Sequence, residues 1–175
     1  ESFAPGVLDR IGLGWSDIHA RKPDISMLSI TNFGHDSPYR DYKGSELVLY
    51  GFGGELYTMG MAHREPVKMF GTAALVESGG AAATAAMGGF LSSKLNGIGQ
   101  WIDFSIVDSH LVGGDRRHAM IIANEFAGRN GLRQGGQAIG MIGGVYPCAD
   151  GWVEFTGAGT RLDRLANMLG NPEWF

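Results

Sequence analysis

The stretch from Gly71 to Gly89 constrains the fold more than any other part of the chain. It reads GTAALVESGGAAATAAMGG, so that nearly all of its residues are Gly, Ala, Ser or Thr, with a single charge at Glu77. Alanine favours helix, whereas each glycine costs roughly 1 kcal/mol in a helix interior. A chain that keeps such glycines usually brings its backbone close to another helix, another chain or a ligand. Two interpretations therefore stay open: a small-residue packing seam, or a tight floor beneath a bound cofactor.

The composition indicates a globular chain and excludes several kinds of partner. Hydrophobic residues make up 44% of the sequence and glycine 29 of its 175 residues, well above the usual glycine share of about 7%. With a net charge of −4, the chain has no overall positive electrostatic potential to attract nucleic acid or acidic membranes, so we expect neither as a partner. The small-residue stretch is too weakly apolar to be a membrane span. Cys148 is the single cysteine, which excludes an intrachain disulfide framework and favours a reducing, cytoplasmic location.

The alternation of apolar runs and helical spacings predicts an α/β fold. We predict strands at Ile25–Thr31 and Trp101–Ile106. Between them we expect a helix from about Gly79 to Leu95, ended by Gly97 as a C-cap-type residue. Val107–Phe126 has the spacing of one long amphipathic helix.

The carboxyl-terminal part carries the clearest local motif. Val145–Ala149 and Trp152–Thr156 predict a β-hairpin with a type I′ turn at Asp150-Gly151. The segment Gly157–Thr160 follows a strand and opens a helix, where phosphates are often bound. The match to a dinucleotide fingerprint is weak, because Leu162 holds the position of the third glycine.

The titratable residues give no metal motif. His35, His63 and His110 show no metal-ligand spacing with the cysteine or with one another, so we predict no metal site. Asp103 and Asp108 lie on or next to a strand end and could serve a site, although exposed edge carboxylates are commoner.

Four separated segments resemble the signature stretches of family III CoA-transferases. They are Glu1–Leu13, Ser29–Tyr39, Gly97–Ser105 and Tyr146–Val153. This group includes formyl-CoA transferase, carnitine and bile-acid CoA-transferases and α-methylacyl-CoA racemase, and the resemblance covers essentially the whole chain. It implies a Rossmann-like α/β domain in an interlocked homodimer, whose closely passing backbones would explain the content of glycine and alanine.

The resemblance also implies a domain organisation. The chain would be the middle of a longer polypeptide, with amino- and carboxyl-terminal parts that lie outside this sequence. Residues 1–140 would belong to the large CoA-binding domain and include the small-residue helix. Residues 141–175 would form a linker and the start of the smaller second domain.

The resemblance assigns CoA or an acyl-CoA thioester as the ligand and places five contacting residues. Phe3 would pack against the nucleotide, while Arg10 and Lys43 suit phosphate groups as cations. Gly135 and Gly136 fall in a glycine-rich loop that covers the thioester in the transferase branch.

The departure from the family lies at the reaction centre. In the transferases an Asp carboxylate attacks the acyl-CoA carbonyl, and that position falls on Leu75, which cannot be a nucleophile. The His and Asp positions of the racemase branch hold Ser45 and Leu75. Glu46 falls on another active-site carboxylate position. Glu77 could replace the nucleophile if the segment before Gly79 is not helical, because two helical residues are about 200° apart.

These residues leave several functions open. The first is a CoA-transferase homologue that is paired with a homologous half carrying the Asp, or that works through Glu77. The second is a non-catalytic acyl-CoA-binding regulatory subunit, and the third a racemase-type enzyme. A weaker alternative is another nucleotide-binding module that uses Gly157–Thr160. The expected protein partner is a second copy of the chain or a catalytic homologous half.

Overall fold

The computed structural model describes residues 1–113, 116–129, 144–155, 162–171 and 173. Two compact units make up the chain. The first consists of Glu1–Tyr57 and Val67–Gly131, and the second of Thr58–Pro66 and Leu132–Phe175. The boundary predicted between residues 140 and 141 lies outside the described residues.

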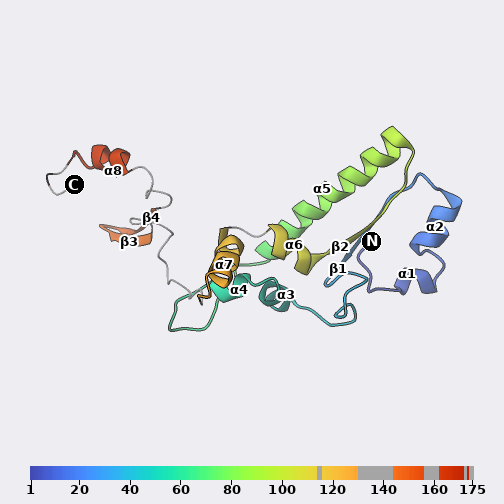
Figure 1. Cartoon of the computed structure of the whole chain (residues 1–175), viewed down its shortest axis with the longest axis horizontal. Helices are drawn as coiled ribbons and strands as arrows, with labels where there is room; N and C mark the ends of the chain where they lie inside the picture. Colours follow the sequence, from blue (N-terminus) through green and yellow to red (C-terminus); the bar gives the residue numbers. More distant parts are fainter. Residues whose placement is uncertain (114–115, 130–143, 156–161, 172, 174–175) are drawn as a thin grey trace. The chain divides into compact units, whose positions relative to one another are not determined.

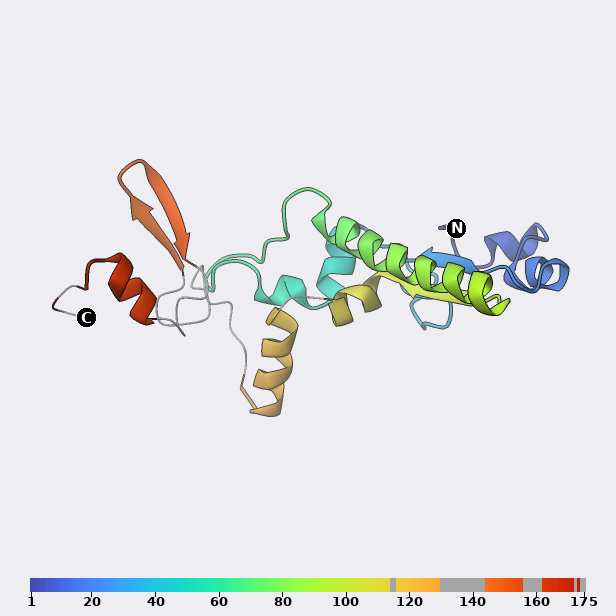
Figure 2. The ribbon, with the colours of Figure 1, turned by 90° about the horizontal axis from the view of Figure 1, so that it is seen from above.

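A parallel pair of strands and a long helix form the frame of the first unit (Figures 1 and 2). Strand β1 (Met27–Thr31) pairs with β2 (Trp101–Ser105) from Met27 opposite Trp101 to Thr31 opposite Ser105. Helix α5 (Ala73–Asn96) connects them along the chain and packs against both strands. The α/β prediction and both predicted strands are confirmed.

Shorter helices surround this frame. Two helices precede β1 along the chain, and two more lie between β1 and α5. The second of this latter pair, α4, has its last residue, Thr58, in the second unit. Two more follow β2. In chain order they are α1 (Val7–Arg10), α2 (Trp15–Arg21), α3 (Glu46–Phe52), α4 (Glu55–Thr58), α6 (Ile106–Gly113) and α7 (Arg116–Phe126).

Helix α5 begins earlier than its composition predicted. It starts at Ala73 rather than near Gly79, because the residues from Ala73 to Glu77 include no helix breaker and Ala74 and Ser78 pack into the unit. The helix ends as predicted: Gly97 is the C-cap, with a φ of 67° that favours glycine.

The packing-seam interpretation holds for one face of α5. Ala74, Ser78 and Ala82 are buried at helical spacing. Gly89 lies against β2, where an added Cβ would stand 2.8 Å from Ile102 Cδ1. Small side chains therefore let this helix approach the sheet closely.

Other glycines of α5 have a different environment. A Cβ added at Gly79, Gly80 or Gly88 would meet no atom within 4 Å in the part of the chain that the structure describes. The cost of these glycines in a helix interior is thus not explained by packing against the described residues.

Most of the helix predicted over Val107–Phe126 is helical in the structure. It is described as α6 (Ile106–Gly113) and α7 (Arg116–Phe126), and residues 114–115 between them lie outside the described residues. Ile106, predicted as the last strand residue, is the first residue of α6.

An apolar cluster beside α6 is the core of the first unit. Phe33, Leu49 and Val107 are buried together, with Ile106 packed against them. The ring of Phe33 also contacts the aromatic rings of Tyr39, Tyr42 and Phe52. This cluster joins the loop after β1 to α3 and α6.

The second unit contains the predicted hairpin and a short helix. Strand β3 (Gly144–Cys148) pairs antiparallel with β4 (Gly151–Phe155), and Cys148 lies opposite Gly151. The predicted type I′ turn is wrong: the two loop residues are Ala149 and Asp150, and neither has a positive φ. Helix α8 (Leu162–Met168) follows. Among the helices described in either unit, none is long and apolar enough to cross a membrane.

Candidate functional site

A pocket of about 120 Å³ lies where the segment of α1 and α2 meets β1 and β2. Short turns position its walls, since Gly6 and Gly12 both have positive φ and bracket α1. The residues that line it include Glu1, Ala4, Asp9, Ser29, His35 and Trp101.

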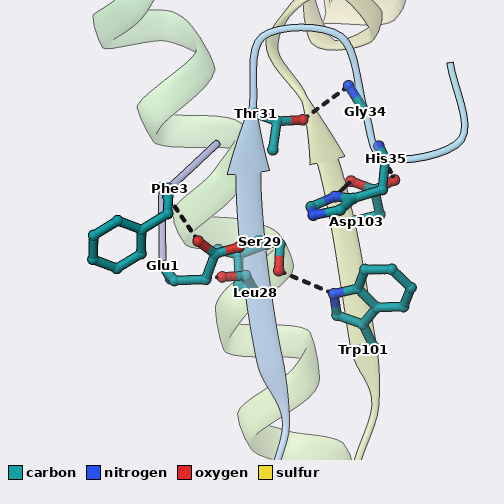
Figure 3. A network of polar contacts seen from close by, with 9 residues as sticks. All are labelled: Glu1, Phe3, Leu28, Ser29, Thr31, Gly34, His35, Trp101 and Asp103. Carbon is teal, nitrogen blue, oxygen red and sulfur yellow. Dashed lines mark hydrogen bonds and ion pairs between the residues drawn. The ribbon is translucent and has the colours of Figure 1, made fainter. Parts of the chain in front are cut away.

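Polar contacts fix the wall formed by the two strands (Figure 3). The Asp103 carboxylate accepts a hydrogen bond of 2.7 Å from the backbone N–H of His35 and lies 2.9 Å from His35 Nδ1. The Trp101 indole N–H donates to Ser29 Oγ at 3.0 Å. Asp103 is therefore not a free edge carboxylate: both of its oxygens bind His35 and hold the loop that follows β1.

Two of the predicted CoA-contacting residues lie next to this pocket in the sequence. Phe3 precedes the lining residue Ala4, and its side chain is 56% exposed. Arg10 follows the lining residue Asp9 and ends α1 with an exposed side chain. Lys43 is exposed in the loop before α3 and does not line the pocket.

The predicted carboxylate Glu46 is engaged in an ion pair. Lys68 Nζ lies 3.0 Å from Glu46 Oε2, whose side chain is only 13% exposed. The same ammonium group donates to the backbone carbonyls of Met69 and Gly71. Glu46 thus anchors the segment that leads into α5, a partnership that no local sequence pattern indicated.

Leu75 and Glu77 lie in different surroundings. Both belong to the helical part of α5, so the non-helical backbone that Glu77 needed to replace the nucleophile is absent there. Leu75 is 39% exposed. Glu77 instead brings a carboxylate oxygen within 4.8 Å of ligand atoms of Glu55 and His110.

The residues around His110 form a polar cluster that no sequence pattern predicted. Glu55 comes from α4, Glu77 and Ser78 from α5, and Ser109 and His110 from α6. No sequence pattern linked these residues to one another, because they come from three separate helices and their spacing matches no motif. Tertiary packing alone brings them together.

A second and larger pocket, of about 500 Å³, lies between α5 and the strand segment before β1. Its lining includes Lys22, Asp24, Phe90, Lys94 and Ile102. The Lys22 ammonium donates to the Asp24 carboxylate and lowers the pKa of Asp24 below its ordinary value. No predicted site residue lines this pocket.

Two groups of predicted residues lie outside the described residues. They are Gly135 and Gly136 of the glycine-rich loop, and the segment Gly157–Thr160. Ser45, which holds the racemase His position, is the N-cap residue of α3.

The whole chain matches one known family. The sequence profile of CoA-transferase family III matches residues 1–175, and the chain therefore belongs to this family. The predicted resemblance is confirmed.

Named relatives are about 30% identical to this chain over nearly its whole length. A succinyl-CoA–D-citramalate CoA-transferase of Chloroflexus aurantiacus is 31% identical over 99% of this chain and 43% of its own. The beta subunit of a succinyl-CoA–L-malate CoA-transferase from the same organism is 30% identical over the same shares, 99% and 43%. The alpha subunit of that type of enzyme is 29% identical over 99% of this chain and 41% of its own. The chain thus spans less than half the length of these relatives.

A solved structure has the same fold. The structure of a CaiB/BaiF family protein from Brucella suis superimposes with a TM-score of 0.78 at 27% identity, over 98% of this chain and 45% of that protein. This agreement supports the arrangement of β1, β2 and α5 as a family III fold.

Proposed function

We propose that this chain is the CoA-thioester-binding part of a family III CoA-transferase whose carboxylate nucleophile comes from a homologous second half. The proposal rests on Leu75, the residue that the resemblance places at the family's nucleophile position, within a chain that matches the family along its whole length. The proposed location is the cytoplasm, in keeping with the single Cys148.

The chemistry of CoA transfer explains why a second half is needed. A carboxylate attacks the thioester carbonyl, forms a mixed anhydride and releases the CoA thiolate. The thiolate then attacks the anhydride at the enzyme's carbonyl carbon, which gives an enzyme-bound CoA thioester and frees the first acid. The hydrocarbon side chain of Leu75 has no lone pair for the first step. Glu77 is a poor substitute, because α5 turns it about 200° from Leu75.

The names of the relatives suggest both the pairing and the first substrate to test. A transferase with alpha and beta subunits that both resemble this chain supports pairing with a homologous half. Succinyl-CoA is the donor named in these relatives. We propose it as the first thioester to assay.

The surface of α5 also supports a protein partner. Apolar side chains on this helix are exposed beside glycines that meet no other described atom. The exposed ones include Val76 at 71% and Leu95 at 76%. Contact with a second copy or a homologous half would bury this surface and use the close approach that glycine permits.

The first prediction concerns binding of CoA. We expect the full-length protein to bind CoA, and we expect Arg10→Ala and Lys43→Ala each to weaken binding about tenfold, as for loss of one charge-assisted phosphate contact. Isothermal titration calorimetry measures the dissociation constants. Arg21→Ala is the matched control, because Arg21 is an exposed cation that ends α2 as Arg10 ends α1. Absence of CoA binding at millimolar concentration would contradict the proposal.

The second prediction concerns the missing nucleophile. We expect Leu75→Asp to gain CoA exchange between succinyl-CoA and an acceptor carboxylate, because the partly exposed position keeps a carboxylate hydrated. A radiolabelled exchange assay measures the rate. Val76→Asp, on the adjacent and more exposed face, should stay inactive. If Leu75→Asp binds CoA yet remains inactive, more than the nucleophile has changed, which favours the regulatory-subunit alternative.

A further inference from the structure

Three helices bring two carboxylates and an imidazole together beneath the start of α5. Ligand atoms of Glu55, Glu77 and His110 all lie within 4.8 Å of one another. Glu55 and His110 are each 1% exposed, whereas Glu77 is exposed. The cluster thus has a buried side and one member that solvent reaches.

A chain of hydrogen bonds fixes the proton on His110. Ser109 Oγ donates to the backbone carbonyl of Ile106 at 2.8 Å, so its single proton is used. In the 2.9 Å contact between the two hydroxyl groups, Ser78 is therefore the donor to Ser109. Since the Ser78 proton is also used, His110 Nε2 must donate in its 3.3 Å contact with Ser78 Oγ.

This tautomer leaves a lone pair on the other ring nitrogen. His110 Nδ1 is buried and has no hydrogen-bond partner among the described residues. A buried nitrogen without a partner is costly, and a cation would satisfy it. An imidazole whose second nitrogen donates to a polar partner is also the usual arrangement of a metal-ligating histidine.

The packing around the ring holds it in this orientation. The ring of Tyr50 meets the His110 ring edge-on, with centroids 6.1 Å apart. Gly53, the C-cap residue of α3, allows the backbone to approach His110, because a Cβ there would lie 2.7 Å from His110 Cβ. The imidazole is therefore preorganised by neighbours that do not belong to the cluster.

We propose that Glu55, Glu77 and His110 form a binding site for a divalent transition metal ion of the zinc class. One imidazole nitrogen and two carboxylates suit Zn²⁺ or Co²⁺ better than Ca²⁺ or Mg²⁺, which prefer oxygen ligands alone. Zinc bonds of about 2.0–2.1 Å place tetrahedral ligand atoms roughly 3.4 Å apart. Closing the cluster from within 4.8 Å to that spacing needs movements of up to about 1.4 Å, to which the exposed Glu77 side chain can contribute. Three protein ligands leave the fourth position to water or a ligand.

Cobalt titration of the full-length, chelator-treated protein tests the site. We expect one equivalent of Co²⁺ to bind with visible absorption bands, to be displaced by Zn²⁺ and to raise the melting temperature. Glu77→Gln should weaken binding at least tenfold, and His110→Gln should abolish it. Ser78→Ala, which removes the partner of Nε2 without touching the metal, should weaken binding roughly tenfold.

The controls separate metal binding from folding. Asp108→Asn alters an exposed carboxylate on the same helix as His110 and should bind Co²⁺ like the unaltered protein. Circular dichroism without metal checks that each variant is folded. If His110→Gln does not fold, Glu77→Gln and Ser78→Ala decide the matter. The proposal is overturned if no Co²⁺ binds at millimolar concentration, or if Glu77→Gln binds it unchanged. Neither result bears on CoA binding, which the variants of Arg10 and Lys43 test separately.

Discussion

Replacing Gly99 with alanine is expected to lower the free energy of unfolding by about 3 kcal/mol, the upper part of the range for overpacking. A Cβ at this position would stand 2.1 Å from the carbonyl oxygen of Ile25 and 2.5 Å from that of Pro23. Both are backbone atoms, so no side-chain rotation can relieve the clash. Urea unfolding of the full-length protein measures the change.

We expect Gly99→Ala to disturb the pocket beside β1 and β2 as well, because Gly99 lies just before β2. Its N–H donates to the Pro23 carbonyl at 3.1 Å, and the Met27 N–H donates to the next residue, Gln100, at 2.8 Å. These bonds set the start of the β1–β2 pairing. A shift there would displace Asp103 from His35, so we expect weaker CoA binding as well as lower stability.

Gly88→Ala is the matched control for Gly99→Ala. No described atom lies within 4 Å of a Cβ at Gly88, which is inside α5. Alanine there should stabilise the isolated chain by roughly 0.5–1 kcal/mol, because it is the better helix former. Equal destabilisation by the two substitutions would contradict the argument from close backbone approach.

The second large effect is expected from Lys68→Met. This change leaves the largely buried Glu46 carboxylate without its ammonium partner and releases the carbonyls of Met69 and Gly71. We expect a loss of about 2 kcal/mol, since removing one member of a buried charged pair leaves the other uncompensated. The midpoint of urea unfolding gives the change.

An exposed ion pair and a double variant test the cause. Lys22→Met removes the same type of partner from Asp24, but there both side chains are about half exposed or more, and we expect a change within about 0.5 kcal/mol. Glu46→Gln combined with Lys68→Met should cost less than the sum of the single changes. Strict additivity would show that the ion pair is not the source.

The anchoring by Lys68 also bears on the proposed reaction. Residues 68–71 lead directly into α5, where Leu75 stands. Without this anchor we expect the first turn of α5 to fray. The Asp side chain introduced by Leu75→Asp would then have no fixed position. We therefore regard Glu46 as a positioning residue rather than a reacting one.

Local sequence patterns were enough to predict the main elements of the first unit. The apolar run before Thr31 and the alternation after Trp101 predicted both strands, since side chains alternate along a strand. Gly97 predicted the end of α5, because a positive φ favours glycine there. The family followed from short motifs spread over the chain.

Local patterns failed where competing preferences were close in energy. The glycines at positions 79 and 80 suggested a later helix start, but burial of Ala74 and Ser78 favours helix from Ala73 onward. At the hairpin, Asp150-Gly151 suggested a type I′ turn, whereas the strand register places the loop one residue earlier.

For the small-residue stretch Gly71–Gly89, some properties follow from the sequence and others only from the tertiary structure. By itself, the sequence predicted a helix rich in small residues here and determined that the single charge in it is Glu77. Only the tertiary structure decided what Glu77 faces. Its neighbours Glu55 and His110 come from other helices, and their approach depends on buried contacts such as those of Ser78 and Gly53. No local periodicity encodes such contacts, because they arise from the packing of segments distant in the chain.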